Sequence, residues 1–113
     1  MSDCLFCAIV AGDVPSTKVL ETDRVLAFRD IAPQAPTHVV VVPKQHFTDT
    51  YDIAHNDPAY LGELMAAATE VAVQEGLTNG YRIITNTGPD SGQTVFHVHA
   101  HVVGGRNLKG LAG

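Results

Sequence analysis

The segment from Val95 to Val103 constrains the fold most strongly, because apolar side chains alternate in it with three histidines. In an extended strand, successive side chains point to opposite faces. One face would carry Val95, His97, His99 and His101, and the other Phe96, Val98, Ala100 and Val102. We therefore expect a strand over about 95–103 that presents imidazoles on one side and packs against a core on the other.

The rest of the chain predicts an α+β domain with a mainly antiparallel sheet. Runs of strand-forming residues bounded by turn residues mark the other strands, and caps and glycines mark two helices. The expected strands are 18–21, 25–29, 38–42 and 81–86; the expected helices are a short one around 5–10, capped by Ser2 or Asp3 and ended by Gly12, and a long one from about Asp57 to Glu75. The chain, residues 1–113, suits one domain and is too short for two.

Charge and hydropathy argue against several classes of function. The net charge is −5 with neutral histidines, which disfavours binding to a nucleic-acid backbone but allows a small nucleotide in a pocket. No apolar run approaches the roughly 18–20 residues that a membrane helix needs, and the N-terminal residues lack the features of a signal peptide. We therefore expect a cytoplasmic protein that binds neither nucleic acid nor membranes.

Two cysteines, Cys4 and Cys7, are separated by two residues. A disulfide framework is not expected in a reducing compartment. The spacing suits a redox pair, half of a zinc site, or two helix residues that face a core. The pair alone does not choose among these three interpretations.

Three imidazoles on one strand face suggest a site for a phosphate-sized group. Alternate residues in a strand lie about 6.5–7 Å apart, so neighbouring rings can serve one small ligand. A metal site and a surface strand that merely carries histidines are the alternatives. A catalytic site is favoured, because neutral imidazole attacks phosphorus and adjacent imidazoles discourage one another from protonating. The polar loop 87–92 supports this, since Gly88 and Gly92 let backbone amides approach an anion.

Several segments resemble the histidine-triad (HIT) family. The run His97-Val98-His99-Ala100-His101-Val102-Val103 resembles the signature of that family. Similar matches are Phe28 to His38 for its nucleoside-side loop and strand, Val42 to His46 for the strand end that follows, and Gly92 to Phe96 for its phosphate loop. Gly104-Gly105-Arg106 resembles the Hint branch rather than the Fhit branch of dinucleoside-polyphosphate hydrolases. The resemblance implies a single HIT domain over 1–113, with a five-stranded sheet, one long helix and one short N-terminal helix.

The resemblance also implies a nucleotide hydrolase of the purine nucleoside phosphoramidase type. Such an enzyme releases a nucleoside monophosphate of the AMP or GMP type through a nucleotidyl-histidine intermediate. His99 would be the nucleophile, His101 would contact the phosphate, and His38 would support the nucleophile. Thr94 would lie near the leaving group, where Hint proteins usually have serine. The implied nucleotide-binding residues are Leu5, Phe6, Ile9, Phe28, Asp30, Ile31, Asn86, Gly92, Gln93, Thr94, Val95, His99 and His101.

Within that set, Asp30 would accept hydrogen bonds from the ribose hydroxyls. Asn86, Gln93 and Thr94 would hold phosphate oxygens. The purine slot would be lined by Leu5, Phe6, Ile9, Phe28 and Ile31, with simple core packing as an equal alternative for Leu5 and Ile9. His55 lies outside every matching motif, and we expect it in a solvated loop.

A structural zinc ion is the only cofactor that the resemblance implies, and no organic cofactor is expected. Its ligands would be Cys4, Cys7, His46 and His97. Two thiolates and two imidazoles form a closed tetrahedral set of the kind that structural zinc prefers.

Other functions stay open at this stage. They are a dinucleoside-polyphosphate hydrolase or nucleotidyl transferase on the same scaffold, a nonenzymatic nucleotide-binding module, and a zinc-binding structural protein. The tail after Arg106 departs from the aromatic, proline-containing ending of animal Hint proteins, so the leaving-group preference does not transfer.

A homodimer is also expected. The long helix near 57–75 carries apolar or small residues on more than one face, and one core covers only one stripe of a helix. The strand 81–86 would be an edge that dimerisation covers. The resemblance implies the same dimer, with a continuous sheet.

Overall fold

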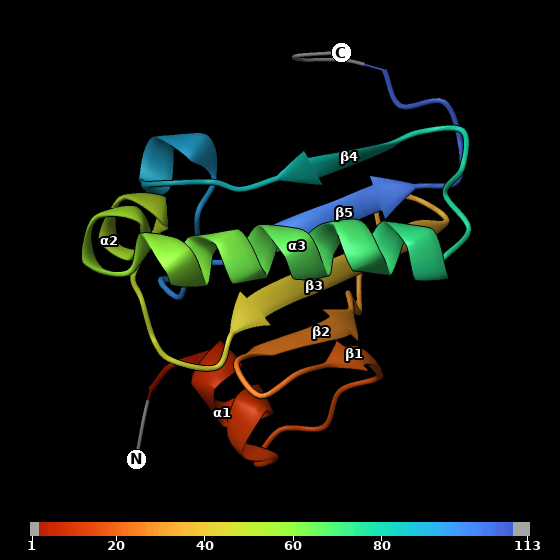
Figure 1. Cartoon of the computed structure of the whole chain (residues 1–113). Coiled ribbons are helices and arrows are strands. Elements are labelled where there is room, and N and C mark those ends of the chain that lie inside the picture. Colours follow the sequence, from red (N-terminus) through yellow and green to blue (C-terminus); the bar gives the residue numbers. More distant parts are fainter. Residues whose placement is uncertain (1–2, 110–113) are drawn as a thin grey trace.

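One antiparallel sheet of five strands forms the centre of the molecule (Figure 1). The structure is a computed structural model that describes residues 3–109. The strands are β1 (Lys18–Glu21), β2 (Val25–Arg29), β3 (Thr37–Pro43), β4 (Tyr81–Ile84) and β5 (Ala100–Gly104), in the order β1-β2-β3-β5-β4. β3 is therefore central, and β1 and β4 are the edges. The expected α+β fold with a five-stranded sheet is confirmed.

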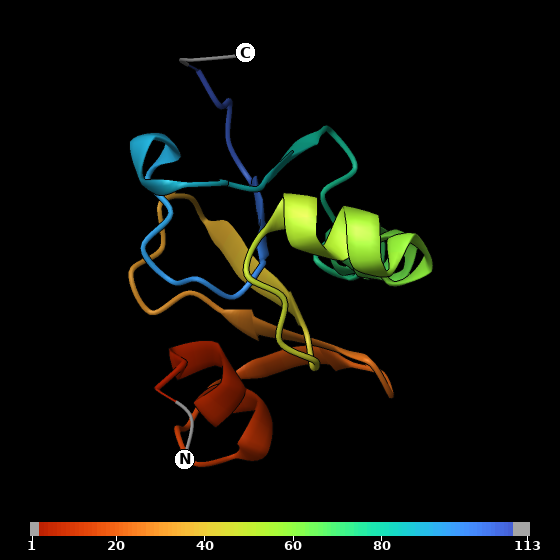
Figure 2. The same ribbon diagram turned by 90° about the vertical axis from the view of Figure 1, so that its left-hand side faces the viewer.

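Helices pack on both faces of the sheet (Figure 2). α3 (Pro58–Gln74) crosses one face, α2 (Thr50–Asn56) leads into it, and α1 (Leu5–Ala11) lies against the other face. In β3, Val39 and Val41 join the core under α3, whereas Val40 and Val42 join the cluster under α1. A run of four valines is thus buried from both sides, as alternation along a strand requires. Within residues 3–109, no helix has both the length and the apolar character needed to cross a bilayer.

The ends of α3 follow the sequence signals. The Asp57 side chain accepts a hydrogen bond from the backbone N of Tyr60 at 3.2 Å, and Pro58 occupies the first turn. Gly76, just past the end, has a φ of 71°, a left-handed conformation that glycine adopts at little cost. The face toward the sheet consists of Tyr60, Leu64, Ala67, Ala68, Val71 and Ala72.

Two features of the helices differ from the prediction. Cys4 caps α1, because its sulfur accepts from the backbone N of Cys7 at 3.4 Å; the predicted cap Asp3 precedes it, and Ser2 lies outside the described residues. Helix α2 was not expected at all. His55 lies in this helix rather than in a loop, although its side chain is exposed as expected.

The strands 81–86 and 95–103 are both shorter than predicted. β4 ends at Ile84, and β5 begins only at Ala100. The backbone N of Val98 donates to the carbonyl of Phe47 at 2.7 Å, a residue beyond the end of β3. The histidine-rich segment thus enters the sheet only at its last part, and Phe96 is 48% exposed instead of buried.

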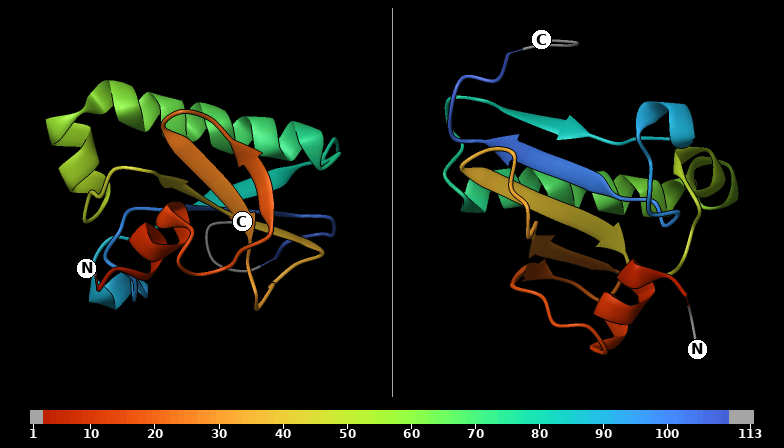
Figure 3. Two further views of the ribbon diagram at one scale, coloured as in Figure 1. Left: turned by 90° about the horizontal axis from the view of Figure 1, so that it is seen from below. Right: turned by 180° about the vertical axis from the view of Figure 1, so that it is seen from behind.

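α1 covers only part of its sheet face. It lies near β1 and β2, whereas β4 is at the opposite edge (Figure 3). The strand register places His101 opposite Val40, which packs under α1, and opposite Ile84 of β4 on its other side. His38 lies two residues before Val40 on β3 and so shares its face. Because opposed residues share a face, His38 and His101 lie on the α1 side of the sheet, toward the β4 edge.

Candidate active site

The backbone just ahead of His99 fixes its orientation. The Nδ1 atom of His99 lies 2.8 Å from the carbonyl oxygen of His97. A carbonyl oxygen can only accept, so Nδ1 carries the proton and Nε2 carries the lone pair. The ring also packs against Phe6, edge to face, with centroids 4.9 Å apart. His99 is thus held in the tautomer that a nucleophilic Nε2 requires.

A chain of hydrogen bonds sets the tautomers of His38 and His101. The backbone N–H of Gln34 donates to Nδ1 of His38 at 3.0 Å, so the proton of neutral His38 is on Nε2. That Nε2 donates to Nδ1 of His101 at 2.8 Å. His101 therefore carries its own proton on Nε2 and is a hydrogen-bond donor. Its ring centroid is 5.0 Å from that of His99. The Nε2 lone pair of His99 and the Nε2–H of His101 can therefore contact the same small group.

Burial favours the neutral forms of His99 and His101. It is the largest cause that lowers the pKa of His99, against the hydrogen bond to the His97 carbonyl and the charge of Asp30, which raise it. Burial, with the neighbouring His99 and His38, lowers the pKa of His101 to about 4. A protonated imidazole has no lone pair to offer, so both shifts widen the pH range in which the site can react.

Asp30 lies beside His38. Its Oδ2 is 3.3 Å from Nε2 of His38, and its Oδ1 accepts from the backbone N of Ala32 at 2.8 Å. The carboxylate thus helps hold both His38 and the loop that follows β2. Each oxygen has a second lone pair, which is what the predicted contact with ribose hydroxyls requires.

Gln93 braces the loop ahead of the histidines. Its Oε1 accepts from the backbone N of Gly88 at 2.8 Å, and its Nε2 donates to the carbonyls of Thr48 and Val95 at 2.9 and 3.2 Å. Gly88 and Gly92 have φ values of 84° and 95°, which favour glycine. The side-chain amide is engaged at both ends, so its contact with phosphate stays a prediction.

The structure brings only some of the predicted nucleotide-binding residues together. Asn86 lines a cavity with His38 and His101. Thr94 instead lines a recess with Leu5 at the start of α1. The contact of Thr94 with a leaving group therefore stays a prediction that the cavity around His101 does not by itself support.

The apolar candidates divide into core and surface residues. Phe6, Ile9 and Phe28 are buried in the cluster under α1, and their contact with a purine stays a prediction. Leu5 is 47% exposed and Ile31 is fully exposed. Leu5 and Ile31 are therefore the members of this set that a ligand could newly cover.

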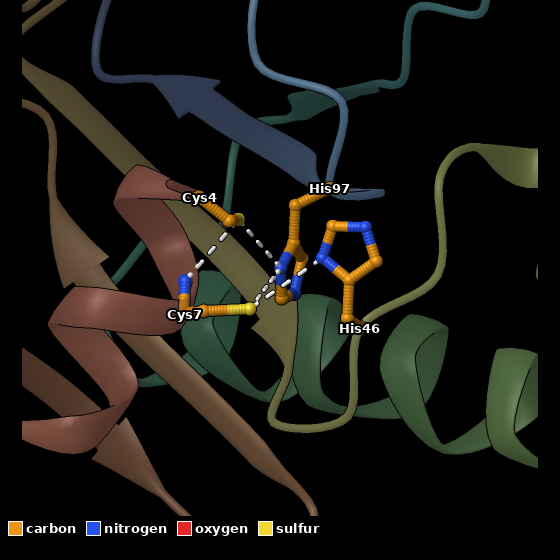
Figure 4. A group of neighbouring side chains, drawn as sticks. All are labelled: Cys4, Cys7, His46 and His97. Atoms are coloured by element: carbon orange, nitrogen blue, oxygen red, sulfur yellow. Dashed lines mark hydrogen bonds between the residues drawn. The ribbon is translucent and has the colours of Figure 1, made fainter. Parts of the chain in front are cut away.

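A second cluster joins α1 to the end of β3 (Figure 4). Cys4 and Cys7 approach His46 and His97, and one donor atom from each of the four lies within 4.8 Å of all the others. The Sγ atoms of Cys4 and Cys7 lie 3.3 and 3.5 Å from Nδ1 of His97, and Sγ of Cys7 lies 3.4 Å from Nδ1 of His46. The sequence-predicted set is thus assembled.

The donor set fits a tetrahedral zinc ion. Ordinary Zn–S and Zn–N bonds at tetrahedral angles separate sulfur from nitrogen by about 3.6 Å, close to the distances found. Nε2 of His97 lies 2.8 Å from the carbonyl oxygen of Pro43, so it is protonated and Nδ1 presents its lone pair to the thiols, as in many metal sites. Burial also lowers the pKa of His97, which favours the neutral form that metals need.

The family model that describes the HIT domain matches residues 11–108. The chain belongs to the HIT family. The match covers most of the chain, including the segment that carries His97, His99 and His101.

Named relatives and a solved structure agree with this HIT assignment. A 14 kDa zinc-binding protein of Brassica juncea is 44% identical over 108 residues, covering 94% of this chain and 96% of that protein. Adenylylsulfatase HINT1 of Arabidopsis thaliana is 43% identical over 109 residues, with 95% and 74% covered. A HIT family hydrolase from Clostridium thermocellum superposes with a TM-score of 0.93 at 40% identity, with 99% and 98% covered. The HIT-like fold is thereby confirmed, and the neighbours indicate a hydrolase.

Sequence reasoning missed the main-chain groups that hold the HIT histidines. These are the amide of Gln34 and the carbonyl of Pro43. Main-chain atoms have no residue-type signal, so no pattern could have identified them. Arg106, whose Nη2 donates to the carbonyl of Gln34 at 2.9 Å, was noted only as part of the Gly104-Gly105-Arg106 match.

Proposed function

We propose that this HIT protein hydrolyses purine nucleoside phosphoramidates and releases a nucleoside monophosphate of the AMP or GMP type. One observation carries the proposal: His99 is buried, neutral and fixed with its Nε2 lone pair available, beside the N–H donor of His101. A nucleophile and a donor in this arrangement suit attack on phosphorus.

The reaction has two displacements. In the first, Nε2 of His99 attacks the α-phosphorus, the bond from phosphorus to the amine breaks, and the amine leaves with the bonding pair and a proton from water. In the second, water attacks the nucleotidyl group, the bond to Nε2 breaks, and the electron pair returns to His99 while a proton passes to solvent. The hydrogen bond from Nδ1–H of His99 to the carbonyl of His97 stabilises the positive charge that the His99 ring carries between the two steps.

His101 and its neighbours position the phosphate. Nε2–H of His101 donates to a nonbridging oxygen, and Asn86 adds a second neutral donor in the same cavity. Asp30 accepts from the ribose, and the purine covers Ile31 and Leu5, which are exposed without it. Burying such apolar surface stabilises the complex by about 25 cal/mol per Å².

We propose that the four-residue cluster holds a structural zinc ion. Cys4, Cys7, His46 and His97 would bind it with no open position, so the metal would connect α1 to the sheet and would not react with the nucleotide. Zinc thiolate ligands suit a reducing compartment.

A homodimer completes the proposal for this single domain of 113 residues. β4 is an edge strand that pairs only with β5 in the described residues. Met65 and Val73 on α3 and Tyr81 on β4 are large apolar side chains that are 37%, 72% and 42% exposed. Pairing of β4 with a second copy would satisfy its edge and cover these side chains.

Replacement of the nucleophile tests the proposed function. His99→Ala should reduce AMP release from adenosine 5′-phosphoramidate by on the order of 10³-fold or more, and the wild type should form a nucleotidyl adduct that the variant lacks. His55→Ala is the matched control, because its exposed imidazole lies against the carbonyl and the ring of Tyr51 in its own helix. Diadenosine polyphosphates, assayed in parallel, test the alternative hydrolase. Near-normal turnover by His99→Ala would refute the assignment.

A further inference from the structure

The seven lysines and arginines of the chain fall into two groups. Four of them form ion pairs with carboxylates on the outer surface: Lys18 and Lys44 with Glu21, Arg24 with Glu63 and Asp57, and Arg29 with Glu75. The other three, Arg82, Arg106 and Lys109, have no carboxylate partner among residues 3–109. The net charge of the chain is −5, yet these three cations have no acidic partner in the described part of the chain.

These three cations line one cavity. Its volume is about 300 Å³, and its walls include His38, His101 and Asn86 but no acidic residue of the described chain. The strand register places Arg82 opposite Val103, two residues along β5 from His101. Residues two apart share a face and lie about 7 Å from one another. Positive charge therefore lies just beyond the donor of the candidate active site.

The cationic side chains keep donors available for a ligand. Arg82 donates from Nη2 to the carbonyl of Leu108 at 3.3 Å, and Arg106 donates from Nη1 and Nη2 to the carbonyls of Asn107 and Gln34. A guanidinium has five N–H donors, so these contacts orient each group without using it up. Carbonyl contacts also leave the full positive charge uncompensated.

We propose that this cavity binds the leaving group and selects one that carries its own negative charge, such as a small carboxylate-bearing amine. The inference rests on the proposed function. A neutral or cationic amine would leave the three cations without a carboxylate partner, whereas a carboxylate placed among them would gain charge-assisted hydrogen bonds. The cavity volume of about 300 Å³ is enough for a small acid.

Two substrates of nearly equal shape test the proposal. They are the adenosine 5′-phosphoramidates of glycine and of glycinamide, which differ in one negative charge. The readout is the ratio of their kcat/KM values, glycine over glycinamide, in the variant compared with the wild type. The two amines also differ in intrinsic reactivity, but this difference is the same for both proteins and cancels in the comparison. Arg82→Gln should lower the ratio, glycine over glycinamide, roughly five- to tenfold. Lys18→Gln, which removes the same charge elsewhere, should leave the ratio unchanged.

The salt dependence of the same ratio can be measured on the wild-type protein alone. Raising the salt from about 0.1 M to about 1 M shortens the screening length from about 10 Å to about 3 Å, so the ratio should fall. Light scattering should show the same mass for Arg82→Gln as for the wild type, which excludes an effect through assembly.

The outcomes separate the two proposals. If Arg82→Gln slows both substrates equally and salt leaves the ratio unchanged, the cations serve the α-phosphate and the inference is overturned, while the proposed function stands. If neither substrate releases AMP, the proposed function fails and the inference with it. A ratio that falls in both experiments supports a site for an anionic leaving group.

Discussion

Removing His38 should reveal how much the hydrogen-bond chain contributes. His38→Ala deletes the acceptor for the Gln34 amide and the donor to His101, contacts of 3.0 and 2.8 Å. Nδ1 of His101 then loses its partner in a largely buried site. A buried polar group without a partner costs about 1–3 kcal/mol. If that free energy is added to the activation barrier, kcat should drop roughly 5- to 150-fold.

The assay separates this role from a general loss of structure. Because His101 would donate to an oxygen whose charge grows in the transition state, kcat should fall while KM changes less. His38→Gln, which keeps an N–H donor at a similar reach, should recover part of the rate. Nitrogen chemical shifts of His101 should show an Nε2–H tautomer in the wild type and a mixture in His38→Ala. A His38→Ala variant with normal kcat and an unchanged His101 tautomer would refute the hydrogen-bond chain.

Three further outcomes are expected. The acid limb of kcat/KM should lie below the ordinary imidazole value of about 6.5, since burial lowers the pKa of His101 to about 4; a midpoint at or above 6.5 would contradict the buried, neutral site. His46→Ala should reduce zinc, measured by elemental analysis, well below one ion per chain and lower Tm by on the order of 5–10 °C, and an undiminished zinc content would exclude His46 as a ligand. Val73→Glu should shift the mass seen by light scattering from two chains toward one of 12.0 kDa; a wild type that already has the mass of one chain would rule out the dimer. Ala68, fully buried against the sheet, is unsuitable for that test, because a charge there would disrupt the monomer.

The elements predicted correctly are those with local signals. The hairpin of β1 and β2 has strand-forming runs on both sides of a short turn, and α3 has Asp57 and Pro58 at its start. Helix α2 lacks such a signal, because Ile53 is its only buried residue and no apolar stripe forms. The pattern Asp49-x-x-Asp52 was the available clue, since the Asp49 side chain accepts from the backbone N of Asp52.

The errors in the site come from contacts between distant segments. The alternation from 95 to 103 predicted one strand. Instead, the backbone N of Val98 donates a hydrogen bond to the carbonyl of Phe47, and Nε2 of His97 donates to the carbonyl of Pro43. These two hydrogen bonds hold the start of the segment outside the sheet. The cap of α1 was assigned to a polar residue by rule, whereas Cys4 takes that place with its sulfur near His97. No local pattern contains these partners.

His97 explains why metal loss should affect stability more than chemistry. Its ring belongs to the cluster of Cys4, Cys7, His46 and His97 that would hold zinc, while its carbonyl accepts a hydrogen bond from Nδ1–H of His99. The proposed zinc site and the candidate active site therefore share His97. If His97 could move, its carbonyl would no longer hold His99 in position. The ring has a second anchor, however, in the 2.8 Å bond to the Pro43 carbonyl, which needs no metal. Removing zinc would release α1 from His46 and His97, a loss of stability, but would leave Pro43 holding His97 and hence His99 in place.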